Sequence, residues 1–238
     1  MQEHTVKAFD EDITRLRGLI AEMGGIAEIA IEEAMRALVS GDEELALTVV
    51  ERDKKLDALE AEVDTMAIRI IALRAPMADD LREIIAALKI GGVVERIGDY
   101  AKNIAKRVGE IEGRKRFEPL TLIPAMAEVA AGMVHDVLTA FAARDPVMAR
   151  EVIERDAKVD AFYDSIFRNL VSYKVENPAT ISSAAQLLFV ARNLERIGDH
   201  ATNVAEMVHF AAIGTYPPDR DTDHGPHLGE DSEDVTIR

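Results

Sequence analysis

The sequence predicts an all-α protein made of two tandem up-down-up three-helix bundles that are related by internal duplication. Apolar residues recur three and four positions apart from about residue 6 to residue 212, and the alternation typical of strands is absent. The string ERIGD occurs at 95–99 and again at 195–199, and a second string at 51–57 returns in similar form at 154–160. Breaks between the helices recur at matching positions in the two halves. Together these patterns indicate that one helical unit is present twice.

The first half contains three long helices separated by short turns. Residues 40–42 (SGD) end the first helix, and Asp42 is a good N-cap for the second. Pro76 lies in a tight turn before the third helix, because proline restricts the residue before it and suits a first helical turn. The three helices are expected at about 6–39, 42–74 and 77–110. Turns this short favour antiparallel packing of neighbouring helices.

The second half repeats this arrangement. Asp145 lies in the position of Asp42, and Pro178 lies in that of Pro76. The three helices of this half are expected at about 119–143, 145–175 and 178–212.

These breaks also define the predicted domains. Residues 1–112 form the first three-helix repeat and 117–213 form the second, joined by a polar linker at 112–119. Residues 214–238 are rich in acids and poor in core-forming residues, so we expect a disordered acidic tail. An alternative packing joins all six helices in one continuous assembly, and it predicts the same candidate site.

The composition describes a soluble globular protein, with 48% hydrophobic and 30% charged residues. The absence of cysteine excludes disulfides, thiolate metal sites and a cysteine nucleophile. A net charge of −16 argues against nucleic acid as a partner, because phosphate backbones require a basic surface. We find no N-terminal signal region and no uncharged apolar run of the ~20 residues that a membrane helix needs. We therefore expect a cytoplasmic protein without a membrane span.

Acidic residues of the first repeat fall on shared helix faces. Glu95, Asp99 and Asn103 are spaced i, i+4 and i+8, and Asp53 and Asp57 are spaced i and i+4. Asp57 and Glu95 lie at equal distances from the proline turn, and so do Asp53 and Asp99. Residues equidistant from the turn of an antiparallel hairpin are level with each other. Four carboxylates can therefore converge between two helices ~8–10 Å apart.

The second repeat carries the same residue types at matching positions: Asp156, Asp160, Glu195, Asp199 and Asn203. Two carboxylates ~5.5 Å apart repel each other by about 3 kcal/mol at an effective dielectric constant of about 20. A cluster of four carboxylates therefore does not stabilise a fold unless a cation occupies it. The pattern predicts a metal site with oxygen ligands in each repeat. Such ligands suit magnesium, manganese or calcium, and iron and zinc also accept carboxylates.

Simpler explanations exist for the individual features. A single acidic pair on a helix is usually a solvated face, and nearby arginines could neutralise the acids. Those arginines are Arg52, Arg96, Arg155 and Arg196. Gly98 and Gly198 each reduce helix stability by about 1 kcal/mol relative to alanine. They indicate either close helix packing or room beside the acids for an ion.

Common enzyme and nucleotide motifs are absent from the sequence, including GxxxxGK[ST], GxGxxG and HExxH. The Glu-x-x-His sequence at 206–209 stands alone, whereas ferritin-like di-iron bundles use paired ones. His200 follows Asp199, but Tyr100 occupies the matching position of the first repeat, so imidazole is not part of the shared site. An enzyme is therefore not predicted.

The motifs resemble those of the PhoU family, bacterial regulators of phosphate uptake and of the phosphate-starvation response. The resemblance is carried by residues 74–82 (RAPMADDLR), 95–105 (ERIGDYAKNIA) and 195–206 (ERIGDHATNVAE). It implies paired three-helix bundles with metal sites on one surface, built from E(D)xxxD motifs. Iron or zinc clusters are associated with some members, and other members lack metal. The matching motifs in this chain are 53–57, 95–99, 156–160 and 195–199.

The resemblance also implies an adaptor function. Such a protein connects the ATPase subunit of the phosphate ABC importer to a membrane sensor histidine kinase, and it keeps phosphate-starvation genes off when phosphate is plentiful. We therefore expect a homodimeric regulator without catalytic activity. Its acids would bind divalent or trivalent metal ions, such as iron, zinc, manganese or magnesium, in mononuclear or multinuclear form. The alternatives are a carboxylate-bridged metalloenzyme or metal store, and a helical scaffold without metal.

Overall fold

The computed structural model describes residues 2–111, 121–176 and 181–217, which form helices and no strand. The helices are α1 (Gln2–Ser40), α2 (Glu43–Arg74), α3 (Asp79–Lys106), the short 3₁₀ helix η1 (Val108–Glu110), α4 (Leu122–Ala143), α5 (Pro146–Glu176) and α6 (Ile181–Ile213). The all-α prediction and the six long helices are therefore confirmed. The predicted linker at 112–119, the turn at Pro178 and most of the predicted acidic tail lie outside the described residues.

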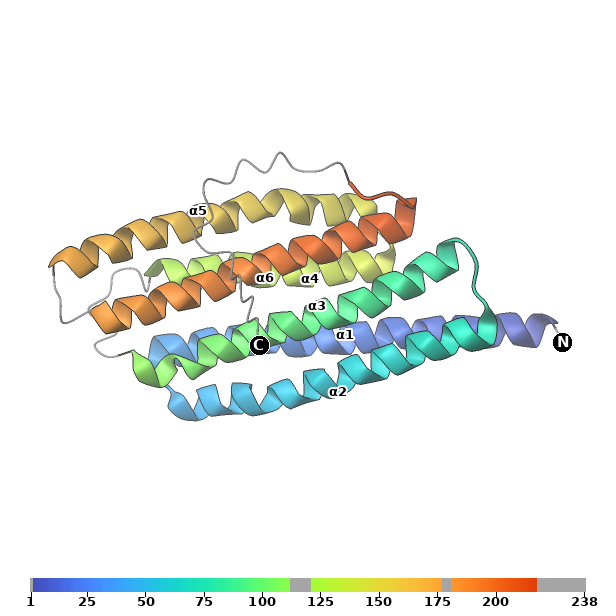
Figure 1. The fold of residues 1–238 in the computed structure, drawn as a ribbon, viewed down its shortest axis with the longest axis horizontal. Coiled ribbons are helices and arrows are strands. Elements are labelled where there is room, and N and C mark those ends of the chain that lie inside the picture. Colours follow the sequence, from blue (N-terminus) through green and yellow to red (C-terminus); the bar gives the residue numbers. More distant parts are fainter. Residues whose placement is uncertain (1, 112–120, 177–180, 218–238) are drawn as a thin grey trace, which may run out of the picture.

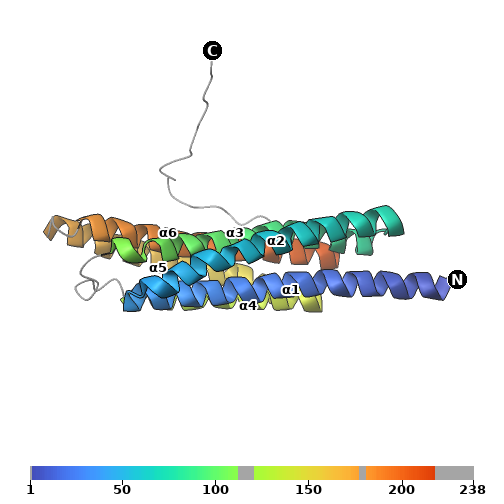
Figure 2. The same ribbon diagram turned by 90° about the horizontal axis from the view of Figure 1, so that it is seen from below.

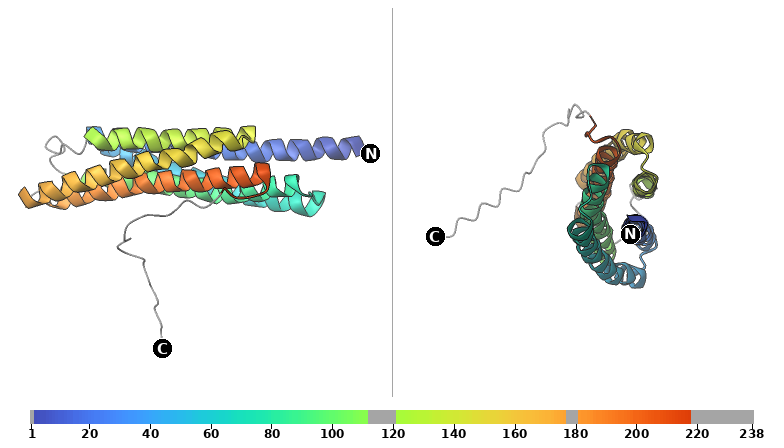
Figure 3. Two further views of the ribbon diagram at one scale, coloured as in Figure 1. Left: turned by 90° about the horizontal axis from the view of Figure 1, so that it is seen from above. Right: turned by 90° about the vertical axis from the view of Figure 1, so that its right-hand side faces the viewer.

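The six long helices form two three-helix bundles that pack side by side (Figure 1). Helices α2, α3, α6 and α5 follow one another in a row, with α3 packed against α6 where the repeats meet. Helices α1 and α4 pack together on one side of this row, as Figure 2 and Figure 3 show. The repeats therefore share a continuous interface, although each keeps its own three-helix order.

The two repeats run in opposite directions. Helix α1 and helix α4 are antiparallel, and the α2–α3 turn lies at the opposite end of the molecule from the neighbouring ends of α5 and α6 (Figure 1). At the interface, the rings of Tyr100 on α3 and His200 on α6 meet edge to face with centroids 5.1 Å apart. These residues hold equivalent positions in the two copies of the motif, so the motifs themselves face each other.

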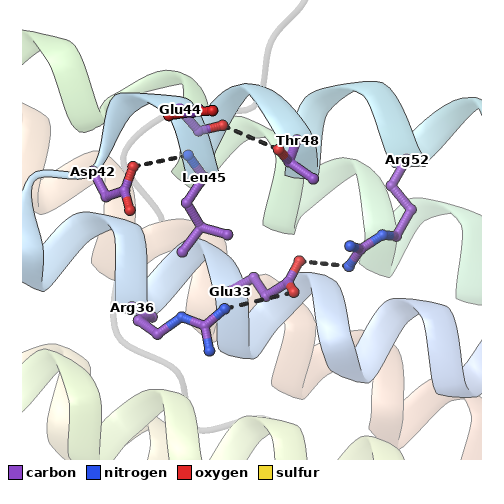
Figure 4. A network of polar contacts seen from close by, with 7 residues as sticks. All are labelled: Glu33, Arg36, Asp42, Glu44, Leu45, Thr48 and Arg52. Atoms are coloured by element: carbon purple, nitrogen blue, oxygen red, sulfur yellow. Dashed lines mark hydrogen bonds and ion pairs between the residues drawn. The ribbon is translucent and has the colours of Figure 1, made fainter.

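The turn between α1 and α2 shows the predicted cap. Asp42 accepts a hydrogen bond from the Leu45 amide at 2.9 Å (Figure 4). Gly41 before it adopts the left-handed conformation with φ 76°. In the second repeat, Asp145 accepts hydrogen bonds from the amides of Val147 at 2.9 Å and Met148 at 3.1 Å. The sequence-predicted N-caps of α2 and α5 are therefore confirmed.

The turn at Pro76 differs in detail from the prediction. Helix α2 ends at Arg74 as expected, but α3 begins at Asp79 and not at residue 77. Ala75 and Ala78 both have positive φ angles, 46° and 47°, which helical residues do not adopt. The delayed start of α3 follows from the positive φ angle at Ala78, which is not helical.

The interior is filled by aliphatic side chains that recur about every two helical turns. On α3, Ile84, Ile90, Ile97 and Ile104 are fully buried, and Ile197 on α6 repeats the position of Ile97. Helices α3 and α6 contact neighbours on more than one side, which explains why their ERIGD motifs combine buried apolar and acidic positions.

Helix α4 is long and apolar enough to cross a membrane by length and composition, with a mean hydropathy of 1.3, and it is the single such helix among the described residues. The sequence pattern did not single it out because it contains Glu128 and Asp136. Its residues Met126, Met133 and Val137 are fully buried. Helix α4 packs against α1, α5 and α6, and 44% of its apolar window is buried in these contacts.

Candidate functional site

The duplicated acids lie on neighbouring helices within each repeat. Those of the first repeat come from α2 and α3, and those of the second come from α5 and α6. Asp53 and Asp156, the first acid of each set, are 6% and 3% exposed. Carboxylates are rarely buried this deeply without a compensating charge.

In the first repeat that charge is a lysine. The Lys102 ammonium group on α3 donates short hydrogen bonds to Asp53 Oδ2 on α2 and to Asp99 Oδ1 on α3. The Lys102 side chain is 20% exposed. Burial lowers the pKa of Lys102, but the hydrogen bonds to Asp53 and Asp99 outweigh this effect and raise the pKa above its usual value. The ammonium therefore stays charged and ties the two helices together.

Burial and other acids of the first repeat raise the pKa of Glu95. Partial burial raises the pKa of Glu95 from 4.5 to about 7, with further contributions from the negative charges of Asp99, Glu60, Asp57 and Asp53. Charges on α2 thus reach a carboxylate on α3, as expected for residues that are level with each other. Glu60 also belongs to this acidic cluster. It has no acidic counterpart in the second repeat, where Tyr163 occupies the equivalent position.

The second repeat brings its four acids within electrostatic reach of one another. Burial raises the pKa of Glu195 to about 7. The charge of Arg192 opposes this increase, and the charges of Asp199 and Asp160 add to it. The pKa of Asp199 is also raised, by desolvation and by the charges of Asp156 and Asp160. Glu195 accepts a 2.5 Å hydrogen bond from Arg192 at Oε1, whereas its buried Oε2 has no hydrogen-bond partner.

The two motif glycines let the helices approach beside these acids. A methyl group added at Gly98 would collide with the buried Leu56 side chain. One added at Gly198 would lie 3.1 Å from Asp156 Oδ1 and 3.3 Å from Val159 Cγ1. Close packing therefore explains both glycines, and at Gly198 the space next to the acidic cluster is part of the same contact.

Two of the arginines that could neutralise the acids are engaged elsewhere. Arg52 pairs with Glu33 on α1 at 2.5 Å (Figure 4), and Arg155 pairs with Asp136 on α4 at 2.7 Å. These ion pairs are equivalent in the two repeats and hold the second helix of each repeat against the first. They leave the acid-bearing faces to other counter-charges.

The asparagines of the two motifs differ in exposure. Asn203 is exposed and Asn103 is half-buried. Across the ranges that the structure describes, no three Asp, Glu or His side chains are arranged to hold one metal ion in common. Metal ligation by Asp53, Asp57, Glu95, Asp99, Asn103 and their counterparts in the second repeat therefore stays a prediction.

Comparison with known proteins assigns the chain to a family. The family model of the PhoU domain matches it twice, at residues 20–108 and 123–208. The chain belongs to the PhoU family. The PhoU homolog of Zymomonas mobilis, named a phosphate-specific transport system accessory protein, is 54% identical over 91% of this chain and 92% of its own length. The Caulobacter vibrioides protein of the same name is 46% identical over 90% of this chain and 94% of its own length.

Solved PhoU structures share the fold. The crystal structure of PhoU from Pseudomonas aeruginosa superimposes with a TM-score of 0.83 at 35% identity, covering 87% of this chain and all of that one. The PhoU family consists of accessory proteins rather than enzymes, which agrees with the expectation of a non-catalytic protein.

Lys102, Glu60 and Arg192 are the site residues that sequence reasoning missed. Each is unique to one repeat, whereas the search relied on acids present in both. Lys102 could have been recognised from the sequence, because it lies three residues after Asp99 and therefore on the acidic face of the same helix.

The raised pKa values predict that the metal-free protein becomes more stable as the solution is acidified. The folded forms of Glu95 and Glu195 take up protons as pH falls through about 7, whereas the unfolded carboxyls do so near 4.5. The folded state therefore binds more protons in this interval, and stability declines as pH rises across it. In a chelating buffer, the double variant Glu95→Gln, Glu195→Gln should melt several degrees above the wild type at about pH 7.5. At about pH 5.5 this difference should shrink, and an equal difference at both pH values would contradict the assignment.

Proposed function

We propose that the protein is an accessory regulator of phosphate-specific transport. The proposal is carried by the match of the PhoU domain to both repeats, together with the high identity to relatives named as accessory proteins of this system. In this role it restrains phosphate uptake and phosphate-starvation signalling when phosphate is plentiful, and it works in the cytoplasm as a homodimer.

The finer proposal is an adaptor that contacts the ATPase subunit of the phosphate importer and the sensor histidine kinase. The exposed apolar side chains support it, because they gather near the helix ends of both repeats and contiguous apolar surface commonly marks a protein interface. At the α2–α3 end they are Ile68, Leu73, Met77 and Leu81, and towards the α5–α6 end they are Phe167, Val171, Ile181 and Phe189. These two sets lie at opposite ends of the molecule (Figure 1), so one chain offers two separate docking regions.

We also propose that the acidic cluster of the second repeat binds metal ions. Its donor set is all carboxylate, its members raise one another's pKa, and one oxygen of Glu195 is buried without a hydrogen-bond partner. A bound cation would add positive charge to that of Arg192 and Arg196, which already act on Glu195 and Asp199. In the described structure no three of these carboxylates share one coordination position, so on binding the side chains of Asp156, Asp160, Glu195 and Asp199 would turn towards the ion between α5 and α6.

Two measurements test these proposals. In a strain without its own copy of the gene, the wild-type chain should restore repression of a phosphate-starvation reporter in phosphate-rich medium. Protein purified without chelator or affinity metal should contain metal by elemental analysis, and the double variant Asp99→Asn, Asp199→Asn should lose most of it. A matched control is Glu51→Gln, Glu154→Gln, which removes two exposed acids from equivalent positions outside the clusters.

The outcomes separate the regulatory and metal proposals. Failure of the wild type to restore repression would refute the regulatory role. Metal-free wild-type protein that still restores repression would refute the metal site alone, and equal losses in both double variants would show that the metal is bound nonspecifically.

A further inference from the structure

The two acidic sites carry the same acids but differ in their built-in cations. The motif reads ERIGDYAKN in the first repeat and ERIGDHATN in the second, so Thr202 stands where the first repeat has Lys102. Thr202 is buried, and its hydroxyl donates a 3.2 Å hydrogen bond to the Gly198 carbonyl of its own helix. It therefore brings no charge to the acids of the second repeat.

Lys102 occupies the position that a shared metal ion would need. Its ammonium nitrogen contacts one carboxylate oxygen from each of the two helices, Asp53 Oδ2 and Asp99 Oδ1. A cation bound by both carboxylates would have to displace this nitrogen, or lie next to a like charge. Because Asp53 is buried, separating it from its partner is strongly unfavourable.

The second repeat has its own cation, but at the edge of the cluster. Arg192, which takes the place of Gly92, pairs with a single oxygen of Glu195 at 2.5 Å. Its side chain is 39% exposed, and its guanidinium lies over the Tyr163 ring, 5.7 Å from the centroid. Arg192 therefore pairs directly with one carboxylate from outside, and its charge and that of Arg196 also act on Asp199, whereas Lys102 contacts two carboxylates from within the cluster.

We propose that Lys102 is a tethered counter-cation that replaces metal in the first repeat, so that only the second repeat binds metal ions. This inference rests on the proposed metal-binding function and divides it unequally between the repeats. The first repeat then carries a built-in counter-charge for its acids, and the second carries one that depends on the supply of metal.

Reciprocal exchange of the two residues tests this assignment, with Mn²⁺ as the probe in calorimetric titrations and elemental analysis. The wild type should show one class of saturable sites. Lys102→Thr should roughly double the bound Mn²⁺, and Thr202→Lys should weaken wild-type binding at least tenfold. Circular dichroism and melting curves establish that each variant is folded.

Acid-to-amide variants provide a second measurement that does not depend on the folding of Lys102→Thr. Asp53→Asn, Asp99→Asn should leave Mn²⁺ binding unchanged, whereas Asp156→Asn, Asp199→Asn should abolish it. Equal loss of metal from both double variants, or two equivalent sites in the wild type, would overturn the assignment and keep the metal proposal. No Mn²⁺ binding by the wild type or by Lys102→Thr would refute the metal proposal as well.

Discussion

Replacing Lys102 with methionine lowers the free energy of unfolding of the metal-free protein by about 3 kcal/mol, as expected when one partner of a buried ion pair is removed. Methionine retains much of the aliphatic length but leaves Asp53, which is 6% exposed, without its positive partner. The quantity to measure is the free energy of unfolding from urea denaturation in a chelating buffer.

Lys89→Met is the matched control for this prediction. Lys89 lies on the same helix, is exposed and forms no ion pair with the residues that the structure describes, so its replacement should change the free energy of unfolding by less than about 0.5 kcal/mol. The double variant Asp53→Asn, Lys102→Met should recover part of the lost stability, because it leaves no buried charge. Equal effects of the two methionine variants would disprove the structural role of Lys102.

The second large effect is expected at Glu83, a 4% exposed acid on α3. It accepts a 2.5 Å hydrogen bond from Arg17 Nε on α1, and it forms a 2.7 Å ion pair with Arg144 at the end of α4. The single carboxylate therefore connects two helices of the first repeat with the second repeat. Arg144 keeps a positive φ angle of 54° at the position that Gly41 holds in the first repeat, which places its side chain for this contact.

Glu83→Gln should reduce the free energy of unfolding by about 2 kcal/mol. Full removal of a buried partner costs more, but Arg17 and Arg144 are 32% and 40% exposed, so water compensates part of the loss. Glu62→Gln is the control, because Glu62 forms an exposed 2.7 Å pair with Arg15 that should contribute less than about 1 kcal/mol. Urea denaturation of both variants measures the difference, and a Glu62 variant as unstable as the Glu83 variant would argue against this anchor.

The sequence predicted those features that repeat or follow from local chemistry. The helical period of apolar residues located the six helices, and Asp42 and Asp145 identified the two N-caps. Duplicated acids led to Asp53 and Asp99, which the structure brings to one nitrogen atom. All of these depend on spacing within one helix or on distance from a turn.

Features that depend on long side chains crossing between helices could not be predicted in this way. Arg52 adjoins Asp53 in the sequence, yet it pairs with Glu33 on α1. Glu83 has no counterpart in the second repeat, where Ser183 occupies its position, so the comparison of the two halves gave it no signal. The direction in which a flexible side chain reaches is set by tertiary packing, which a helical period does not encode.

The contact between Tyr100 and His200 has a consequence for how such a chain can change. In a dimer of separate, identical three-helix chains, the side chains that meet at the symmetry axis must be the same, and every substitution happens twice. Here one covalent chain carries both copies, so a tyrosine can face a histidine and a lysine can exist on one side alone. Fusion of the halves thus removes the requirement for identity and lets each copy acquire its own chemistry within a common scaffold.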